Sequence, residues 1–356
     1  MIPKYSASEN ARPLVYLDQN VIDKLSKGKA QWLVELFSEK YRAVYSDVTL
    51  EEISRAEEGR EGSAKRFLKA LDLVNAYYIS PAFDANMSPQ DGLIVRDIPP
   101  VDAFEEYRAN SKFKGILEAN TLVSRKLVGG KIGLSTDEIF KELSEQFQEL
   151  ENSIEENIAE LEKVIPDARE LLYGAFHKGD ELKRITPDDF DEKAKEMLKN
   201  LGPQLDVDSH KDSAMETFRA ALKLSPVELN NIKPPNVVQQ VWEYIAKDKN
   251  IKDSGLTMDE YFGLDGSYSV YPDREPFKSE LVQTVYHQLN FCGYYPDKKL
   301  YNDSNFTSSF SDMVHVSRAS YCTSLISGDE RLIKKAQATY EYVGIDTLAI
   351  HVMFDE

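Results

Sequence analysis

The chain has 356 residues, of which 42% are hydrophobic and 29% are charged, and its formal net charge is −18. This composition is that of a globular protein with one large domain or two smaller ones, and no apolar run approaches the roughly 20 residues of a membrane span. The first residues lack the apolar core of a signal peptide, and two cysteines, Cys292 and Cys322, are too few for a disulfide framework, so we expect a cytoplasmic protein with no membrane partner.

Residues 1–83 alternate between predicted strands and helices. A short apolar run ends on Asp18, and apolar residues at helical spacing follow it. Asp47 is placed to cap the helix after the second strand. The predicted strands cover residues 12–18, 41–46 and 76–80, and the predicted helices cover residues 21–39, 48–58 and 63–76.

Residues 84–280 lack this alternation and predict a mainly helical insertion. An apolar stripe from Ile139 to Ile165 indicates a helix of roughly eight turns that packs against its neighbours. Capping signals predict the starts of three helices, and residues 251–278 predict a loop rich in Gly, Asp and Tyr. The capping signals are Ser135 with Glu138, Thr186 with Pro187, and Ser225 with Pro226 and Glu228.

The negative charge of the chain is concentrated in this insertion. Residues 137–170 hold 12 acidic and 3 basic residues, a net charge of −9, whereas residues 1–83 and 281–356 together carry −3. The overall acidity therefore does not exclude a nucleic-acid substrate bound by the two ends of the chain. A solvated surface is the default explanation of the acidic face, and the alternative is that it walls the substrate groove or mimics phosphate to restrain the site. The insertion is also the candidate docking region for an inhibitor or partner protein.

Residues 281–356 return to alternating strands and helices. Ser311 is placed to cap a helix over residues 312–321, a strand covers residues 323–327, a helix opens at Asp329, and a last strand follows Gly344. Strands that alternate with helices predict a parallel sheet covered on both faces. We therefore expect an α/β protein made of residues 1–83 and 281–356, interrupted by the helical insertion of residues 84–280.

Four carboxylates lie where predicted strands end, at Asp18, Glu52, Asp312 and Asp329. Open α/β sheets place their sites at the carboxyl ends of strands, and hard divalent cations take oxygen ligands. Two carboxylates about 4 Å apart repel by about 4 kcal/mol at an effective dielectric near 20, so four together require protonation or a cation. A divalent ion would relieve the repulsion and lower the pKa of bound water, which supplies a hydroxide at neutral pH.

The motifs around these carboxylates resemble those of the PIN domain family of ribonucleases. LVYLDQN resembles the first motif, YSDVTLEEI the second, SDMVHVSRA the third and LISGDERL the fourth, in which Ser327 stands where the family has Thr. The resemblance covers less than half of the chain, and the insertion matches no motif of the family. It implies a three-layer α/β/α sandwich with a central parallel sheet, and a site with one or two Mg²⁺ or Mn²⁺ ions that hydrolyses RNA.

On this resemblance, Asp18 and Asp329 are the principal metal ligands, Asp312 completes the site, and Glu52 binds metal or orients the attacking water. Asn20, His315 and Ser327 are expected beside them: Asn20 as a bracket of the Asp18 loop, His315 near substrate or in plain packing, and Ser327 in a hydrogen bond near Asp329. Three of these assignments have alternatives, because Asp18 and Asp312 could serve only at helix starts, and Glu51 could replace Glu52.

We expect a metal-dependent endoribonuclease, of the kind used as a microbial toxin or defence effector. The alternative is a catalytically inactive PIN-like scaffold that binds RNA or protein. Aromatic residues of the Tyr-rich loop are candidates for base stacking, and basic residues near the site are stronger candidates for RNA contact. The aromatic set is Tyr261, Phe262, Tyr268 and Tyr271, and the basic set is Lys24, Lys27, Lys29, Arg55, Arg60, Lys334 and Lys335.

Overall fold

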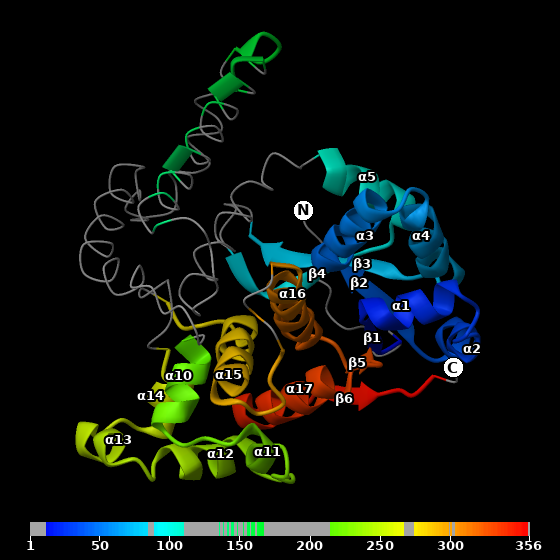
Figure 1. Ribbon diagram of the computed structural model, residues 1–356. Coiled ribbons are helices and arrows are strands. Elements are labelled where there is room, and N and C mark those ends of the chain that lie inside the picture. The colour runs from blue at the N-terminus through cyan, green and yellow to red at the C-terminus, as the bar shows by residue number, and fades with distance from the viewer. Residues whose placement is uncertain are drawn as a thin grey trace.

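A six-stranded sheet forms the centre of the protein. The computed structural model describes residues 12–84, 89–109, 214–266, 274–298, 300 and 303–354, with single positions and short stretches between 135 and 166. The strand order is β4-β3-β2-β1-β5-β6, and all neighbouring strands are parallel except β3 and β4. The strands are β1 (Leu14–Leu17), β2 (Arg42–Ser46), β3 (Tyr77–Phe83), β4 (Pro89–Arg96), β5 (Ser324–Ser327) and β6 (Leu348–His351). The fold is therefore α/β with a mostly parallel sheet (Figure 1).

The central strands are buried on both faces. Side chains alternate between the two faces of a strand, so Val15 and Leu17 of β1 enter one hydrophobic core while Tyr16 enters the other. In β2, Tyr45 and Val44 divide in the same way. Strands of this kind appear in the sequence as short continuous apolar runs, which is why their positions were predicted.

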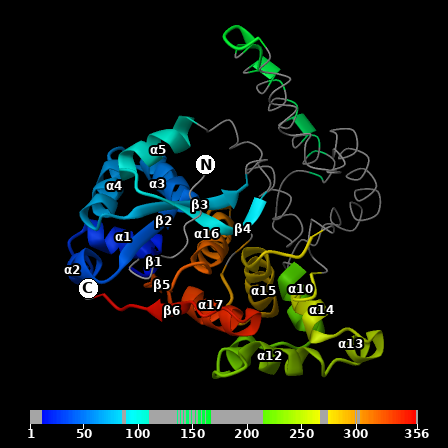
Figure 2. The same ribbon diagram turned by 180° about the vertical axis from the view of Figure 1, so that it is seen from behind.

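Helices pack against both faces of the sheet, as the two opposite views in Figures 1 and 2 show. On one face lie α1 (Gln19–Ser26), α2 (Trp32–Glu39), α3 (Asp47–Gly59), α4 (Ser63–Leu73) and α5 (Pro100–Ala109). On the other face lie α15 (Lys278–Cys292), α16 (Asp303–Ala319) and α17 (Glu330–Val343). The sheet thus joins helices from the two ends of the chain.

A further set of helices packs on the outer side of α15 and α17. Leu289 of α15 and Ala338 of α17 belong to this third core together with Val241 and Phe262. The helices are α10 (Ala214–Ala221), α11 (Pro226–Leu229), α12 (Val237–Ile245), α13 (Lys249–Ser254) and α14 (Met258–Phe262). In the part of the chain that the structure describes, no helix is long and apolar enough to cross a membrane.

Two predicted helices differ in the structure. The helix predicted over residues 21–39 is divided into α1 and α2, because the chain turns at Gly28, whose φ of 75° lies in the left-handed region. The helix predicted to begin at Asp312 begins at Asp303 instead, so Ser311 lies inside α16 and does not cap it. The polar run before Ser311 is helical because Phe306 packs against Met215 in a small core of its own.

The predicted boundaries of the insertion fall inside structural elements. Residue 83 is the last residue of β3, which forms an antiparallel pair with β4, and the boundary at residue 281 lies within α15. The strand β4 was missed because it lies at the sheet edge, where only its half-buried Leu93 and Val95 pack against the core. The sheet and α5 therefore continue the first half of the fold to residue 109.

The insertion differs from its prediction mainly between residues 251 and 278. Part of this predicted loop is helical, in α13 and α14, and the rings of Tyr261 and Phe262 are buried, so neither is placed to stack on a base. Tyr268, Tyr271, Thr186, Pro187 and most of the Ile139 to Ile165 stripe lie outside the described residues. The helix starts at Ser135 and Ser225 are confirmed, since each side chain accepts a hydrogen bond from the backbone N–H three residues later.

Candidate functional site

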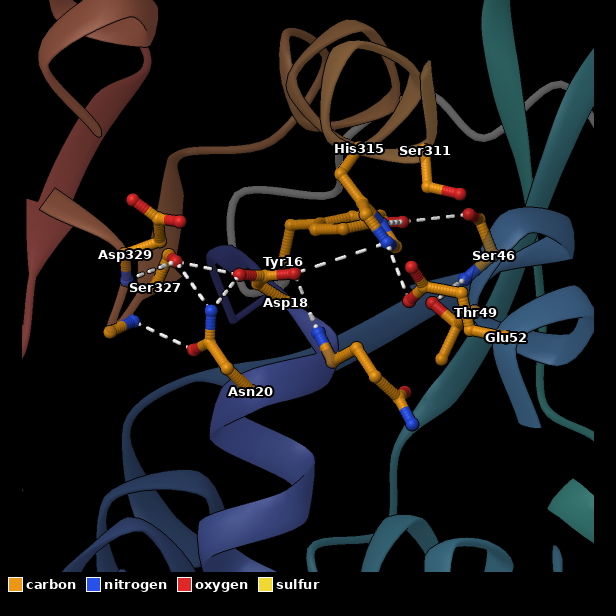
Figure 3. Close-up of polar contacts among 12 residues, drawn as sticks. Tyr16, Asp18, Asn20, Ser46, Thr49, Glu52, Ser311, His315, Ser327 and Asp329 are labelled. Atoms are coloured by element: carbon orange, nitrogen blue, oxygen red, sulfur yellow. Dashed lines mark hydrogen bonds and ion pairs between the residues drawn. The ribbon is translucent and has the colours of Figure 1, made fainter. Parts of the chain in front are cut away.

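Asp18 lies at the carboxyl end of β1 and is 3% exposed. It precedes α1, and its Oδ1 accepts a hydrogen bond from the backbone N–H of Gln19 at 2.7 Å. Its Oδ2 accepts hydrogen bonds from the hydroxyl of Ser327, at 2.6 Å, and from the amide of Asn20. Asp18 is thus a helix cap, as the ordinary explanation required, and also the buried centre of a polar cluster (Figure 3).

Asn20 and Ser327 connect the end of β1 to the end of β5. The Asn20 amide donates to the Ser327 hydroxyl at 3.0 Å, and its carbonyl oxygen accepts from the backbone N–H of Gly328 at 2.7 Å. A side chain at position 328 would come within 3.2 Å of that carbonyl oxygen, which favours glycine there. Asn20 therefore links the loop after β1 to the loop after β5 by hydrogen bonds, as predicted.

Glu52 and His315 bring the two halves of the chain together above β1. His315 of α16 is fully buried, and its Nε2 lies 3.0 Å from Oε2 of Glu52 on α3 and 3.9 Å from Oδ1 of Asp18. Burial alone would lower the pKa of His315, but Glu52 and Asp18 raise it to about 9. The raised pKa favours the protonated imidazole at neutral pH. Figure 3 shows the ring between Glu52 and Asp18.

A buried chain of hydrogen bonds fixes the other side of the His315 ring. Nδ1 lies 2.8 Å from the hydroxyl of Tyr16, which lies 2.7 Å from Oγ of Ser46. Because protonated His315 donates from both nitrogens, Tyr16 accepts from Nδ1 and donates to Ser46. Neither Tyr16 nor Ser46 was among the predicted site residues. The signal was present in LVYLD, where Tyr16 faces the opposite side of β1 from Val15 and Leu17 and needs a buried partner for its hydroxyl.

Asp312 interacts electrostatically with Asp18 and His315 of this cluster. Burial raises the pKa of Asp312 well above its ordinary value, and the charges of Asp18 and Asp297 raise it further. Burial also raises the pKa of Asp18; the charge of His315 opposes that rise and the charge of Glu52 adds to it. Burial is the largest cause of both shifts, and the repulsion of Glu52 on Asp18 and of Asp18 on Asp312 adds to it, which a cation would relieve.

Asp329 occupies a more exposed position at the end of β5. Its Oδ1 accepts hydrogen bonds from the backbone N–H groups of Arg331 and Leu332, at 2.7 and 3.2 Å, and so caps α17. Its own backbone N–H donates to Ser327 Oγ at 2.9 Å, so the predicted link between Ser327 and Asp329 runs through the main chain. Asp329 is thus beside Asp18, but it is the least buried of the four carboxylates.

An ion pair that the sequence did not indicate lies behind Asp312. The ammonium group of Lys335 is 2.8 Å from both carboxylate oxygens of Asp297, and Lys335 is fully buried. Lys335 therefore cannot contact RNA at the surface, contrary to the prediction, because its charge is used inside the fold. Nearby, the buried Tyr286 hydroxyl has no hydrogen-bond partner among the described residues. The turn that carries Asp297 has no motif from which this pairing could be inferred.

A second ion pair, partly exposed on the Asp47 side, joins α3 to α16. Arg318 donates from Nε and a terminal nitrogen to the two oxygens of Asp47, at 3.2 and 3.0 Å. Asp47 was predicted to cap α3, but Ser46 is the capping residue. The cap moves back one residue because β2 ends directly on Ser46, which leaves Asp47 in the first helical turn to pair with Arg318.

No family model, curated protein or solved structure matches this chain. The resemblance to the PIN family therefore stays a prediction from the motifs. Within the described ranges, no three His, Cys, Asp or Glu side chains are arranged as a group that could hold a metal ion. What the geometry provides is a buried polar cluster of Asp18, Glu52 and His315, with Asp312 close enough to act on them by charge.

Proposed function

We propose that this protein is a metal-dependent endoribonuclease with a PIN-like core, a three-layer α/β/α sandwich, and that Asp18, Glu52, Asp312 and Asp329 form its catalytic site. The observation that carries the proposal is the buried Asp18 at the carboxyl end of a central parallel strand, in contact with His315 and under the charge of Glu52. Sites of α/β proteins lie at this edge of the sheet.

The type of donor suits Mg²⁺ or Mn²⁺, whereas in the described residues no three such side chains are yet arranged around one point. All four proposed ligands are carboxylates, the oxygen donors that hard cations prefer, and burial with mutual repulsion raises the pKa of Asp18 and Asp312. A carboxylate has about four acceptor positions, and three of those on Asp18 take hydrogen bonds from Gln19, Asn20 and Ser327. One position on Asp18 is therefore left for a cation.

The chain's own residues would orient this site for phosphodiester hydrolysis. Ser327 and Asn20 hold Asp18 in a single orientation, and His315 holds Glu52 through the proton on Nε2. A bound divalent ion would supply a low pKa for the attacking water and charge compensation for the phosphate. The buried hydrogen bonds supply fixed positions, without which such sites lose activity.

The second candidate function is the inactive scaffold, and one observation favours it. His315 already places a positive charge between Glu52 and Asp18, so the fold has an internal cation that partly compensates these carboxylates. In a scaffold this ion pair would be purely structural. The two candidate functions differ in one outcome: the nuclease would cleave RNA when a divalent ion is added, and the scaffold would not.

The test is RNA cleavage by the purified protein with Mn²⁺ or Mg²⁺, with and without chelator. The endoribonuclease proposal predicts metal-dependent cleavage that Asp18→Asn abolishes. Asp72→Asn is the matched control, because it makes the same chemical change at an exposed position of α4. If a panel of structured and single-stranded RNAs stays intact with each ion, the scaffold replaces the enzyme.

A further inference from the structure

A cation at the edge of the carboxylate cluster has a position suited to RNA binding. Arg55 follows Glu52 by three residues on α3, so the two side chains share one face of the helix. Its guanidinium donates a hydrogen bond to Oγ of Ser311 on α16 at 2.8 Å and lies 3.7 Å from Oε1 of Glu52. Arg55 therefore lies next to the proposed catalytic site, at the contact between α3 and α16.

Three other cations near the cluster are buried or paired. The His315 and Lys335 side chains are fully buried, and Arg318 makes a two-point pair with Asp47. Arg55 is different, because 31% of its side chain is exposed, compared with 17% for Glu52. A ligand at the open edge of the cluster would meet Arg55 before any of these three.

Arg55 also retains hydrogen-bonding capacity. Its Nε is buried without a hydrogen-bond partner among the described residues, because Oε1 of Glu51 is 3.9 Å away, so the donors that a ligand can reach are those of the terminal nitrogens. A guanidinium carries five N–H donors in a planar fork that matches two oxygens of a phosphate. Repulsion between RNA and the nearby carboxylates makes such a cation necessary for binding at this edge.

The remaining predicted RNA contacts lie farther from the cluster. Lys24, Lys27 and Lys29 lie at or beyond the last turn of α1, whereas Asp18 is at its beginning. Arg60 follows Glu52 by eight residues, which places it about 12 Å farther along the helix direction at 1.5 Å per residue. Distance along the helices thus separates Arg55 from these four basic candidates.

We propose that Arg55 binds a backbone phosphate of the RNA strand beside the carboxylate cluster and so determines substrate affinity. This inference rests on the proposed nuclease function and adds the residue that holds the substrate. The exposed guanidinium turns one of its N–H edges to the phosphate, while Ser311 keeps the side chain directed along the α3 and α16 contact.

The experiment compares Arg55→Gln with Arg60→Gln, which removes the same charge from an exposed position at the end of the same helix. Cleavage of a short fluorescein-labelled single-stranded RNA is measured with Mn²⁺ at several salt concentrations. We expect Arg55→Gln to raise KM roughly tenfold or more, the effect of losing one hydrogen bond to a charged group, with kcat nearly unchanged. The slope of log affinity against log salt should fall by about 0.7, the value for one phosphate contact on a single strand.

Arg60→Gln should leave KM and the salt slope near those of the unmodified protein. If Arg55→Gln matches Arg60→Gln in KM and slope, or lowers kcat alone, the phosphate-binding role is wrong although the nuclease function stands. If the unmodified protein cleaves no RNA, the nuclease function itself fails, and the inference fails with it. Thermal unfolding of each variant verifies that the compared proteins are folded.

Discussion

Ser327 provides a stringent test of how the site is held together. Its hydroxyl donates to Oδ2 of Asp18 at 2.6 Å and accepts from the Asn20 amide and the backbone N–H of Asp329, at 3.0 and 2.9 Å. The side chain is fully buried. Ser327→Ala would remove one hydrogen bond to a buried charge, which contributes about 1.5–3 kcal/mol, and would leave the Asn20 amide with one acceptor fewer.

We therefore expect Ser327→Ala to lower the free energy of unfolding by about 2–4 kcal/mol. The matched control is Ser320→Ala, since Ser320 is also buried and makes one neutral hydrogen bond, to the carbonyl of Ser317 at 2.7 Å. This control should cost about 1 kcal/mol. Urea unfolding in chelator, with circular dichroism as the signal, measures both. Equal losses for the two variants would refute the hydrogen bond between Ser327 and a charged Asp18.

Three further predictions concern the charged groups of the cluster. The pKa of His315 is raised from 6.5 to about 9 in the folded protein. Its pairing therefore stabilises the metal-free protein fully below pH 6.5, and about 3 kcal/mol of the free energy of unfolding is lost as pH rises through 9. Urea unfolding of His315→Gln at a series of pH values should lack this loss. Asp312→Asn should increase metal-free stability at pH 8 but not at pH 4, because a raised carboxyl pKa costs stability only as pH rises above the unfolded value. Lys335→Met should destabilise the fold by about 3–5 kcal/mol, measured by the same unfolding assay, because it leaves Asp297 without its buried partner.

The strands and the Asp18 loop were predictable from local sequence. The run LVYL is buried on both faces, and its boundaries follow from the apolar residues themselves. The ends of parallel strands meet at one edge of a sheet, so the approach of Ser327 to Asp18 also follows from the strand pattern. Local signals were insufficient for β4 and for the start of α16. The strand β4 is a half-buried edge strand and the first turns of α16 are mostly polar, so the hydrophobic periodicity of both segments is weak.

The ion pairs between α3 and α16 were not predictable, because they depend on how the helices pack. Arg318 and Asp47 are 271 positions apart, and His315 and Glu52 are 263 positions apart. Each partner taken alone has an ordinary local explanation, as a helix cap or a solvated charge. Only the packing of α16 against α3 decides that these side chains meet, and no local pattern encodes the crossing of those two helices.

Asp329 illustrates the limit of a motif. LISGDERL predicts an acidic residue at the end of a strand, and the structure places Asp329 there. The same position is the first cap of α17, and the hydrogen bonds to Arg331 and Leu332 use one of its oxygens. Its proposed role as a metal ligand therefore depends on the other oxygen, whereas Asp18 is held within the cluster from both sides.

Anomalous diffraction from crystals of the protein grown with Mn²⁺ tests the central claim most directly. The account predicts an anomalous peak with carboxylate oxygens of Asp18 and at least one of Glu52, Asp312 and Asp329 at coordination distance, about 2.0–2.6 Å for hard cations. The same crystals of Asp18→Asn should lack the peak. A map of well-ordered protein with no peak at this cluster, under Mn²⁺ concentrations that give metal peaks elsewhere, would contradict a metal-dependent site at the end of β1.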